Sequence, residues 1–207
     1  MGTKRTLEPL PNTLRRRSPA RPSREPTFEA TFAHYRATLE AREAAVEAIE
    51  ADLAAWSTRP PFQEAVARLG AYRGITHMGA LHLASEVCDW RRFPTAGPFM
   101  AFTGLTPSEH SSGERTRRGH ITHAGNVHLR TQLVEAAWAY RSRPGLGVEL
   151  RRRQVGAPPE TLARAWRAQL RLSGRSRRLD ERKGNRSVVV TAVARELDGF
   201  IRAEMTA

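Results

Sequence analysis

The feature that most constrains the fold of this chain is a stripe of apolar residues between positions 28 and 56. Its members recur at alternating spacings of three and four residues, with Arg42 in the one skipped position. They are Phe28, Phe32, Tyr35, Leu39, Val46, Ile49, Leu53 and Trp56. This spacing predicts one long helix with a heptad-like face, which the pair Pro60–Pro61 ends. We therefore expect a helix over residues 28–58.

Two roles fit this long helix. As a coiled-coil arm it would pair copies of the chain through the stripe and give a homodimer or a higher oligomer. As an ordinary bundle helix it would dock the same stripe on its own domain. Because about four heptads are the lower limit for recognising a coiled coil, the residues alone leave both roles open.

Positive charge is the dominant property of the composition. The chain has 34 Lys and Arg residues against 21 Asp and Glu, a formal net charge of +13. All but Lys4 and Lys183 are arginines, and arginine forms forked contacts with phosphate. A GC-rich genome would explain arginine in place of lysine, but not the excess of basic over acidic residues. The composition therefore predicts a nucleic-acid partner.

Several observations bear on where the protein works. No apolar run approaches the ~20 residues that span a bilayer, and residues 1–27 lack the apolar core of a secretory signal. That segment is rich in Pro and Arg, and we expect it to be a disordered leader. The single cysteine, Cys88, permits no internal disulfide. We expect a cytoplasmic protein without a membrane segment.

The rest of the sequence predicts an all-α fold, with a compact domain over residues 62–142 and a basic helical tail over 143–207. Helical periodicity covers 62–69, 77–87, 95–102, a segment that Thr122 would cap, a segment from 158 and a segment from 188. Residues 103–119 lack apolar periodicity and predict a long functional loop. Residues 174–184 predict a polar linker, and 187–191 fit a strand or a helix start equally.

A tight glycine turn lies between the first two helices of this domain. Arg73, Gly74 and Thr76 occupy it, and the helix–turn–helix order is similar to a helix-hairpin-helix motif. In such a motif the N–H groups of the hairpin and the next helix N-terminus hold a DNA phosphate. The match is partial, because Thr76 stands where the motif usually has a second glycine. A purely structural αα-hairpin is the alternative.

The loop over 103–119 contains the residues best suited to chemistry. Ser108, Ser111 and Ser112 offer hydroxyls, and Gly113 lets a ligand approach the backbone closely. Three arginines follow within six residues of the serine pair: Arg115, Arg117 and Arg118. An exposed hydroxyl beside arginines suits attack on phosphorus, although no general base is identifiable. A loop that only binds phosphate has the same composition.

The sequence gives little support for a zinc site, an acidic metal site or a serine hydrolase. The histidines at 110, 120, 123 and 128 match no zinc cage, and the acidic residues lie at salt-bridge spacings rather than converging on a metal. His110 and Ser112 lack the strand–turn–helix elbow and the orienting third group of a serine hydrolase. We therefore expect no metal site and no cofactor within this chain.

The residues from Tyr72 to Tyr140 closely resemble the C-terminal domain of the DEDD-type insertion-sequence transposases, also called bridge-RNA-guided recombinases. The matching elements, in order, are the RGI turn, the RF-P segment, TGLTPSEHSSG, R-G-x-I-T-x-A-G-N-x-H-L-R and VEAAW. Weaker similarity extends over residues 28–205. The resemblance implies DNA transposition and recombination, and places the 28–58 helix in the coiled-coil region of the family.

The resemblance also assigns roles to individual residues. In that family a serine attacks DNA and forms a phosphoserine link, which implies Ser112 as the nucleophile and Ser111 as the fallback. The candidate nucleic-acid contacts are Arg73, Gly74, Thr76, Arg115, Arg117, Arg118, Thr122, Asn126 and Arg130. The implied partners are DNA and a structured guide RNA.

The family binds Mg²⁺ on an N-terminal RuvC-like domain that this sequence lacks, so Mg²⁺ is implied only for that domain. We accordingly expect a truncated transposase that performs no strand transfer alone. The alternative is a non-catalytic helix-hairpin-helix module that binds DNA or RNA.

Overall fold

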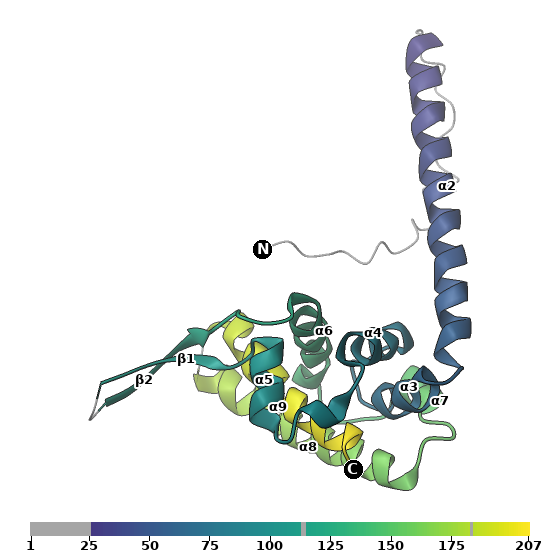
Figure 1. The fold of residues 1–207 in the computed structure, drawn as a ribbon. Coiled ribbons are helices and arrows are strands. Elements are labelled where there is room, and N and C mark those ends of the chain that lie inside the picture. Colours follow the sequence, from purple (N-terminus) through teal and green to yellow (C-terminus); the bar gives the residue numbers. More distant parts are fainter. Residues whose placement is uncertain (1–25, 113–114, 183) are drawn as a thin grey trace. The chain divides into compact units, whose positions relative to one another are not determined.

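Helices make up most of the described chain, and the all-α prediction is confirmed (Figure 1). The computed structural model describes residues 26–112, 115–182 and 184–207, without the side chains of 109–118. The predicted leader therefore lies almost entirely outside the described residues. The chain divides into two units, residues 1–51 and 52–207.

The elements follow in a simple order along the chain. They are α2 (Pro26–Ser57), α3 (Phe62–Gly70), α4 (His77–Val87), η1 (Trp90–Arg92), α5 (Ala96–Thr103), β1 (Pro107–Ser112), β2 (Arg115–Ile121), α6 (Val127–Ala137), η2 (Trp138–Arg141), α7 (Val148–Arg153), α8 (Pro159–Arg182) and α9 (Arg186–Met205). The first unit contains most of α2, and the second contains all the elements after it.

The long helix predicted from the apolar stripe is confirmed as α2. Pro26 is its first residue, where a missing N–H is tolerated, and Glu29 in the first turn interacts favourably with the helix dipole. Every apolar member of the stripe is exposed, from 37% at Leu53 to 70% at Tyr35. Its use as a coiled coil remains a prediction.

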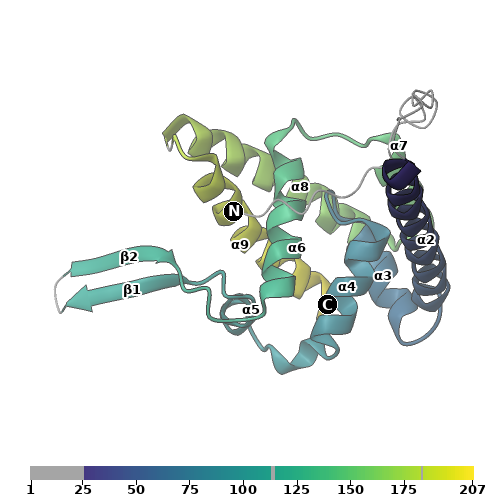
Figure 2. The same cartoon turned by 90° about the horizontal axis from the view of Figure 1, so that it is seen from above.

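Helix α9 runs through the centre of the second unit (Figures 1 and 2). It contacts α3, α5, α6 and α8. Its buried apolar residues recur at helical spacing: Val189, Val190, Val193, Ala194, Leu197 and Ile201. One hydrophobic core therefore includes side chains from α3, α4, α5, α6, α8 and α9. The 187–191 segment, which the sequence left open, is helical.

The prediction of an irregular loop over residues 103–119 is wrong. The chain there forms an antiparallel hairpin of β1 and β2, in which Pro107 pairs with Ile121 and Ser112 with Arg115. Both strands consist almost entirely of polar residues. Because apolar alternation reveals a strand only when one face is buried, the sequence carried no strand pattern.

Two boundaries also differ from the predictions. Helix α6 begins at Val127 with Asn126 as its N-cap, so the expected cap at Thr122 is wrong. Helix α8 continues to Arg182 through Gly174, where we expected a linker. Its inner face still has residues to bury there, because Ser173 and Ser176 are both buried. A glycine inside a helix costs about 1 kcal/mol, which such packing offsets.

A buried carboxylate fastens the C-terminal turn of α9 to the core. Glu204 is fully buried and accepts hydrogen bonds from Tyr72, Thr161, Arg68 and Arg164. Burial raises the pKa of Glu204, but the hydrogen bonds from Arg164, Thr161 and Arg68 outweigh it and hold the pKa at about 2. The charged form is thus strongly preferred in the folded chain.

We predict that Glu204→Gln lowers the free energy of unfolding by about 3 kcal/mol at pH 7, because it removes the buried carboxylate that pairs with the partly buried guanidinium groups of Arg68 and Arg164. Since the folded pKa lies below the ordinary value of 4.5, this stabilisation is complete above about pH 5 and is lost as the pH falls towards 2. Urea unfolding followed by circular dichroism measures both effects. A difference between wild type and variant that stays constant from pH 7 to pH 3 contradicts the prediction.

Candidate nucleic-acid interface

The β1–β2 hairpin extends from the helical body beyond α5 (Figures 1 and 2). Its register pairs Ser112 with Arg115, Ser111 with Thr116 and His110 with Arg117. Both serines thus lie near the tip, next to Gly113 and Glu114, which are outside the described residues. The structure likewise does not describe the side chains of Ser111, Ser112, Arg115, Arg117 and Arg118.

The base of the hairpin, residues 102–106 and 122–126, is held by main-chain contacts, and we call it the neck. The N–H of Thr122 donates to the carbonyl of Thr106 at 2.8 Å, and the N–H of Asn126 donates to that of Phe102 at 2.7 Å. A Cβ at Gly125 would lie 2.5 Å from the Phe102 carbonyl oxygen. Position 125 therefore requires glycine.

Two predicted nucleic-acid contacts have structural partners in the neck. Asn126 caps α6 by accepting from the N–H groups of His128 and Leu129, and its amide donates to Glu86 at 2.6 Å. Arg130 donates to the carbonyl of Thr103 at 3.1 Å. Thr122, a third predicted contact, is exposed. Asn126 and Arg130 thus make structural contacts at the neck, and nucleic-acid binding by Thr122, Asn126 and Arg130 remains a prediction.

A carboxyl group that sequence reasoning missed lies beneath the neck. Asp198 of α9 is fully buried, and its Oδ2 is 2.9 Å from the Thr103 hydroxyl. Its Oδ1 has no hydrogen-bond partner among the described residues. Burial raises the pKa of Asp198 to about 7, partly offset by the Thr103 hydrogen bond. Only the fold reveals this group, because in the sequence it lies on an ordinary helix.

The predicted helix-hairpin-helix turn is occupied by packing contacts. Arg73 donates to the carbonyl of Arg143 at 2.7 Å. Gly74 has φ +84°, and a Cβ there would lie 2.2 Å from the Ala136 carbonyl oxygen of α6. Thr76 caps α4 by accepting from Gly79 N at 3.0 Å. These contacts give Arg73, Gly74 and Thr76 structural roles in an αα-hairpin. Phosphate binding by these residues remains a prediction.

Polar residues from α4 and α6 gather beside the neck. His82 approaches Glu86 at 3.6 Å, and the rings of His82 and His128 are 6.1 Å apart. Since Glu86 and Asn126 are separated by 40 positions, no sequence spacing could reveal their contact. Within the described residues, no three His, Cys, Asp or Glu side chains are arranged to hold a metal ion.

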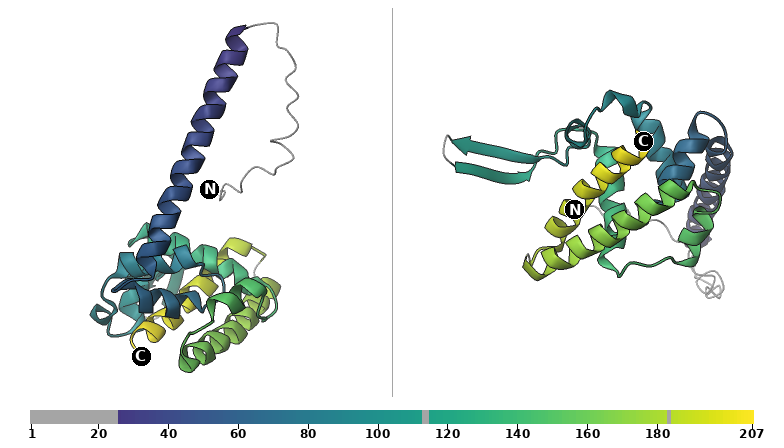
Figure 3. Two further views of the ribbon diagram at one scale, coloured as in Figure 1. Left: turned by 90° about the vertical axis from the view of Figure 1, so that its right-hand side faces the viewer. Right: turned by 90° about the horizontal axis from the view of Figure 1, so that it is seen from below.

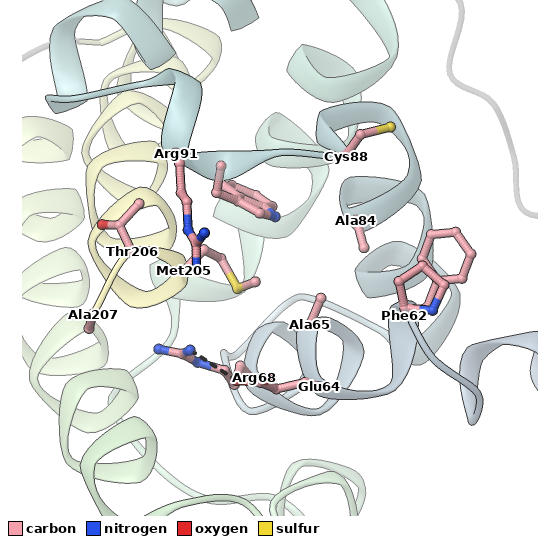
Figure 4. Close-up of a pocket in the computed structure, with 12 residues that line it drawn as sticks. Phe62, Glu64, Ala65, Arg68, Ala84, Cys88, Arg91, Met205, Thr206 and Ala207 are labelled. Carbon is pink, nitrogen blue, oxygen red and sulfur yellow. Dashed lines mark hydrogen bonds and ion pairs between the residues drawn. The ribbon is translucent and has the colours of Figure 1, made fainter.

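A cavity of about 630 Å³ lies between α3, the end of α4 and the end of α9 (Figure 4). Arg68 and Arg91 reach into it, and Phe62, Trp90 and Met205 contribute apolar walls. It contains none of the residues that the sequence singled out for function. The candidate site is therefore the hairpin with its neck, not this cavity.

Comparison with known proteins shows what the segment around the hairpin is similar to. Residues 66–147 match the model of the "Transposase IS116/IS110/IS902 family". This segment runs from the core residue Val66 of α3 through the hairpin and its neck to Gly147. It therefore includes the whole candidate site.

Long segments of the chain are similar to named transposases. It is 44% identical over 138 residues to "Putative transposase y4qE" of Sinorhizobium fredii, covering 67% of this chain and 35% of that protein. It is 36% identical over 72 residues to the transposase for insertion sequence element IS1111A of Coxiella burnetii, covering 35% and 20%. The transposase for IS1533 of Leptospira borgpetersenii is 28% identical over 160 residues, covering 75% and 45%. The chain thus spans less than half the length of these relatives, and over the matched segments it is similar to insertion-sequence transposases.

No helix in the described part of the chain combines the length and apolarity needed to cross a membrane. The expectation of a cytoplasmic location stays a prediction.

We predict that both Asn126→Ala and Asn126→Asp lower the free energy of unfolding by about 1–2 kcal/mol, for different reasons. The alanine removes the helix cap, whereas the aspartate keeps the cap but places a carboxylate against Glu86. In a Glu86→Gln background the aspartate variant therefore recovers stability and the alanine variant does not. Urea midpoints of the four variants measure this. Equal losses for Asn126→Asp in both backgrounds would refute the like-charge contact.

Proposed function

We propose that this chain is the DNA-handling, serine-bearing part of an insertion-sequence transposase, with Ser112 as the nucleophile. The observation that carries the proposal is the register of the hairpin, in which Ser112 pairs with Arg115 inside the segment that matches the transposase family. Cα atoms of paired antiparallel positions lie about 5 Å apart. A serine and an arginine at such positions can reach one phosphate group.

The neck supports this role mechanically. A catalytic group is effective only when its support is rigid, because small misplacements cost much of the rate. The Gly125 contact and the main-chain hydrogen bonds fasten the hairpin to α5, while Asn126 fastens it to α4 and α6. The hairpin is thus tied to several helices of the core.

The proposed chemistry is a transesterification at one phosphodiester of the DNA. The Ser112 oxygen attacks a phosphodiester phosphorus, the bond to one deoxyribose oxygen breaks, and a phosphoserine link forms while the sugar leaves with a hydroxyl. Arg115, Arg117 and Arg118 would neutralise the charge that develops on phosphorus. The net charge of +13 would hold the DNA nearby.

Metal chemistry is not part of this chain's proposed role. The family resemblance assigns Mg²⁺ to a RuvC-like domain, and we propose that such a domain, rather than this chain, binds the metal. We propose that the chain alone performs no strand transfer. A guide RNA is the second nucleic-acid partner that the resemblance implies.

We predict that the chain, combined with a RuvC-like domain, Mg²⁺ and end-labelled DNA, forms a covalent protein–DNA adduct that survives a denaturing gel. Ser112→Ala abolishes the adduct, because no oxygen remains to form the link, whereas Ser111→Ala retains it. The chain without the added domain yields no strand exchange.

Three results would contradict parts of this proposal. An adduct lost only in Ser111→Ala moves the nucleophile to Ser111. Robust strand exchange by the chain alone removes the need for the second domain. Salt-sensitive DNA binding that is indifferent to both substitutions, with no adduct under any condition, supports the non-catalytic binding module instead.

We further propose that α2 joins copies of the chain. Its apolar stripe is exposed along the helix, with Phe28 at 62% and Ile49 at 58%. Exposed apolar residues at heptad spacing are typical of coiled-coil partners. Two or more copies would hold two DNA ends in one complex, which a recombination reaction requires.

We predict that Ile49→Lys shifts the chain to a smaller species, because a charge at the centre of the stripe disrupts apolar packing between helices. Ala44→Lys, on the opposite face of α2, is the matched control and leaves the mass unchanged. Sedimentation equilibrium at several concentrations measures both. A monomeric wild-type chain, or equal effects of the two substitutions, would argue against association of copies through the apolar stripe of α2.

A further inference from the structure

Helix α8 presents an exposed face that the hairpin does not account for. It lies at the surface of the second unit, on the lower side in Figure 1 and towards the viewer in the right panel of Figure 3. Trp166 and Leu170 are large apolar residues four positions apart on this helix, a spacing that favours burial of both. They are instead 40% and 49% exposed, because Ala165, Ala168 and Leu172 form the side that packs in the core.

Positive charge accompanies these apolar side chains. Arg167, Arg177 and Arg178 are exposed, and they form no ion pair with any residue in the described part of the chain. By contrast, Arg171 and Arg175 are paired with Glu196 of α9. From residue 166 to residue 178 this surface, which we call the α8 face, extends about 18 Å.

We propose that the α8 face binds unpaired nucleotides of a single-stranded nucleic acid, with a base stacked on Trp166 and phosphates held by Arg167 and Arg178. This binding is separate from the attack by Ser112 on DNA and does not depend on it.

The tryptophan and arginines of the α8 face fit a single strand better than a duplex or a neutral apolar partner. Every base has a π face, and stacking on an aromatic ring beside arginines is the common way in which proteins hold single strands. A duplex hides the faces of its bases, so it could use the arginines but not the indole. A neutral apolar partner would leave the three arginines beside it without counter-charge.

Charge also disfavours a second copy of the chain at this place. Two copies that met through the α8 face would bring the same three arginines together, and like charges in an interface are destabilising. The partner must therefore be anionic as well as flat and apolar in part. Nucleotides have both properties.

Another exposed tryptophan provides a matched control. Trp138 is 38% exposed, nearly as much as Trp166, but the guanidinium of Arg141 lies over its ring at 5.4 Å. Arg141 also lies 4.0 Å from Asp180. A base would have to displace this arginine to stack on Trp138, whereas among the described residues no cation is stacked on Trp166.

The test is fluorescence anisotropy of the purified full chain with labelled oligothymidine and oligouridine of about 15 nucleotides, a length that one binding module covers. Trp166→Ala should weaken binding about 5- to 100-fold, and Trp166→Phe should restore most of it, because a phenyl ring still stacks. Trp138→Ala should leave the affinity unchanged. Arg167→Gln with Arg178→Gln should lower the slope of log affinity against log salt by about 1.4.

Comparison of the two strands identifies the source of the nucleotides. Tighter binding of oligouridine assigns the face to RNA, and equal or tighter binding of oligothymidine assigns it to unpaired DNA. Affinity unchanged by Trp166→Ala, or equal losses for Trp166→Ala and Trp138→Ala, would overturn the proposal. So would a loss of self-association in Trp166→Ala with oligonucleotide binding intact, since the face would then be covered by a second copy. None of these results depends on the Ser112 adduct.

Discussion

The carboxylate of Glu204 is the interaction on which the second unit depends. It lies at the C-terminal end of α9, and α9 is the helix against which α3, α5, α6 and α8 pack. Two arginines, a threonine and a tyrosine from α3, its following turn and α8 converge on it. A buried charge with so many donors is stable only in one arrangement of these helices, which favours a unique packing of the core.

The same protein also leaves much of its positive charge without counter-charges. Arginines with a structural task are paired with acids or carbonyls, as Arg68 is with Glu204 and Arg202 with the carbonyl of Phe93. Others, such as Arg167 and Arg178, have no ion-pair partner within the described residues. Charge of this kind contributes little to folding and repels itself. We propose that its use lies in binding a polyanion, as the similarity of residues 66–147 to transposases suggests.

The sequence predicted the helices that bury one face in the core. For the candidate site it predicted which residues take part, but not the hairpin that contains them or the contacts that they make. Periodicity located α3 and α4 almost to the residue, because Val66, Leu69 and Leu83 must face the core. It failed for the polar hairpin, whose strands lack apolar alternation, and for Trp166, whose side chain is exposed. Contacts such as that between Asn126 and Glu86, or the burial of Asp198, depend on the packing of distant segments, and no local pattern encodes them.

The close contact at Gly125 has a consequence for how such a protein can change. The main chain at the neck sets where the hairpin leaves the core, through carbonyl and N–H groups that every sequence possesses. The residues beyond the neck therefore do not determine the position of the hairpin. Substitutions near the tip can alter what the hairpin binds without moving the point from which it extends. Anchoring and recognition are therefore separate traits, and selection can act on one while the other stays fixed.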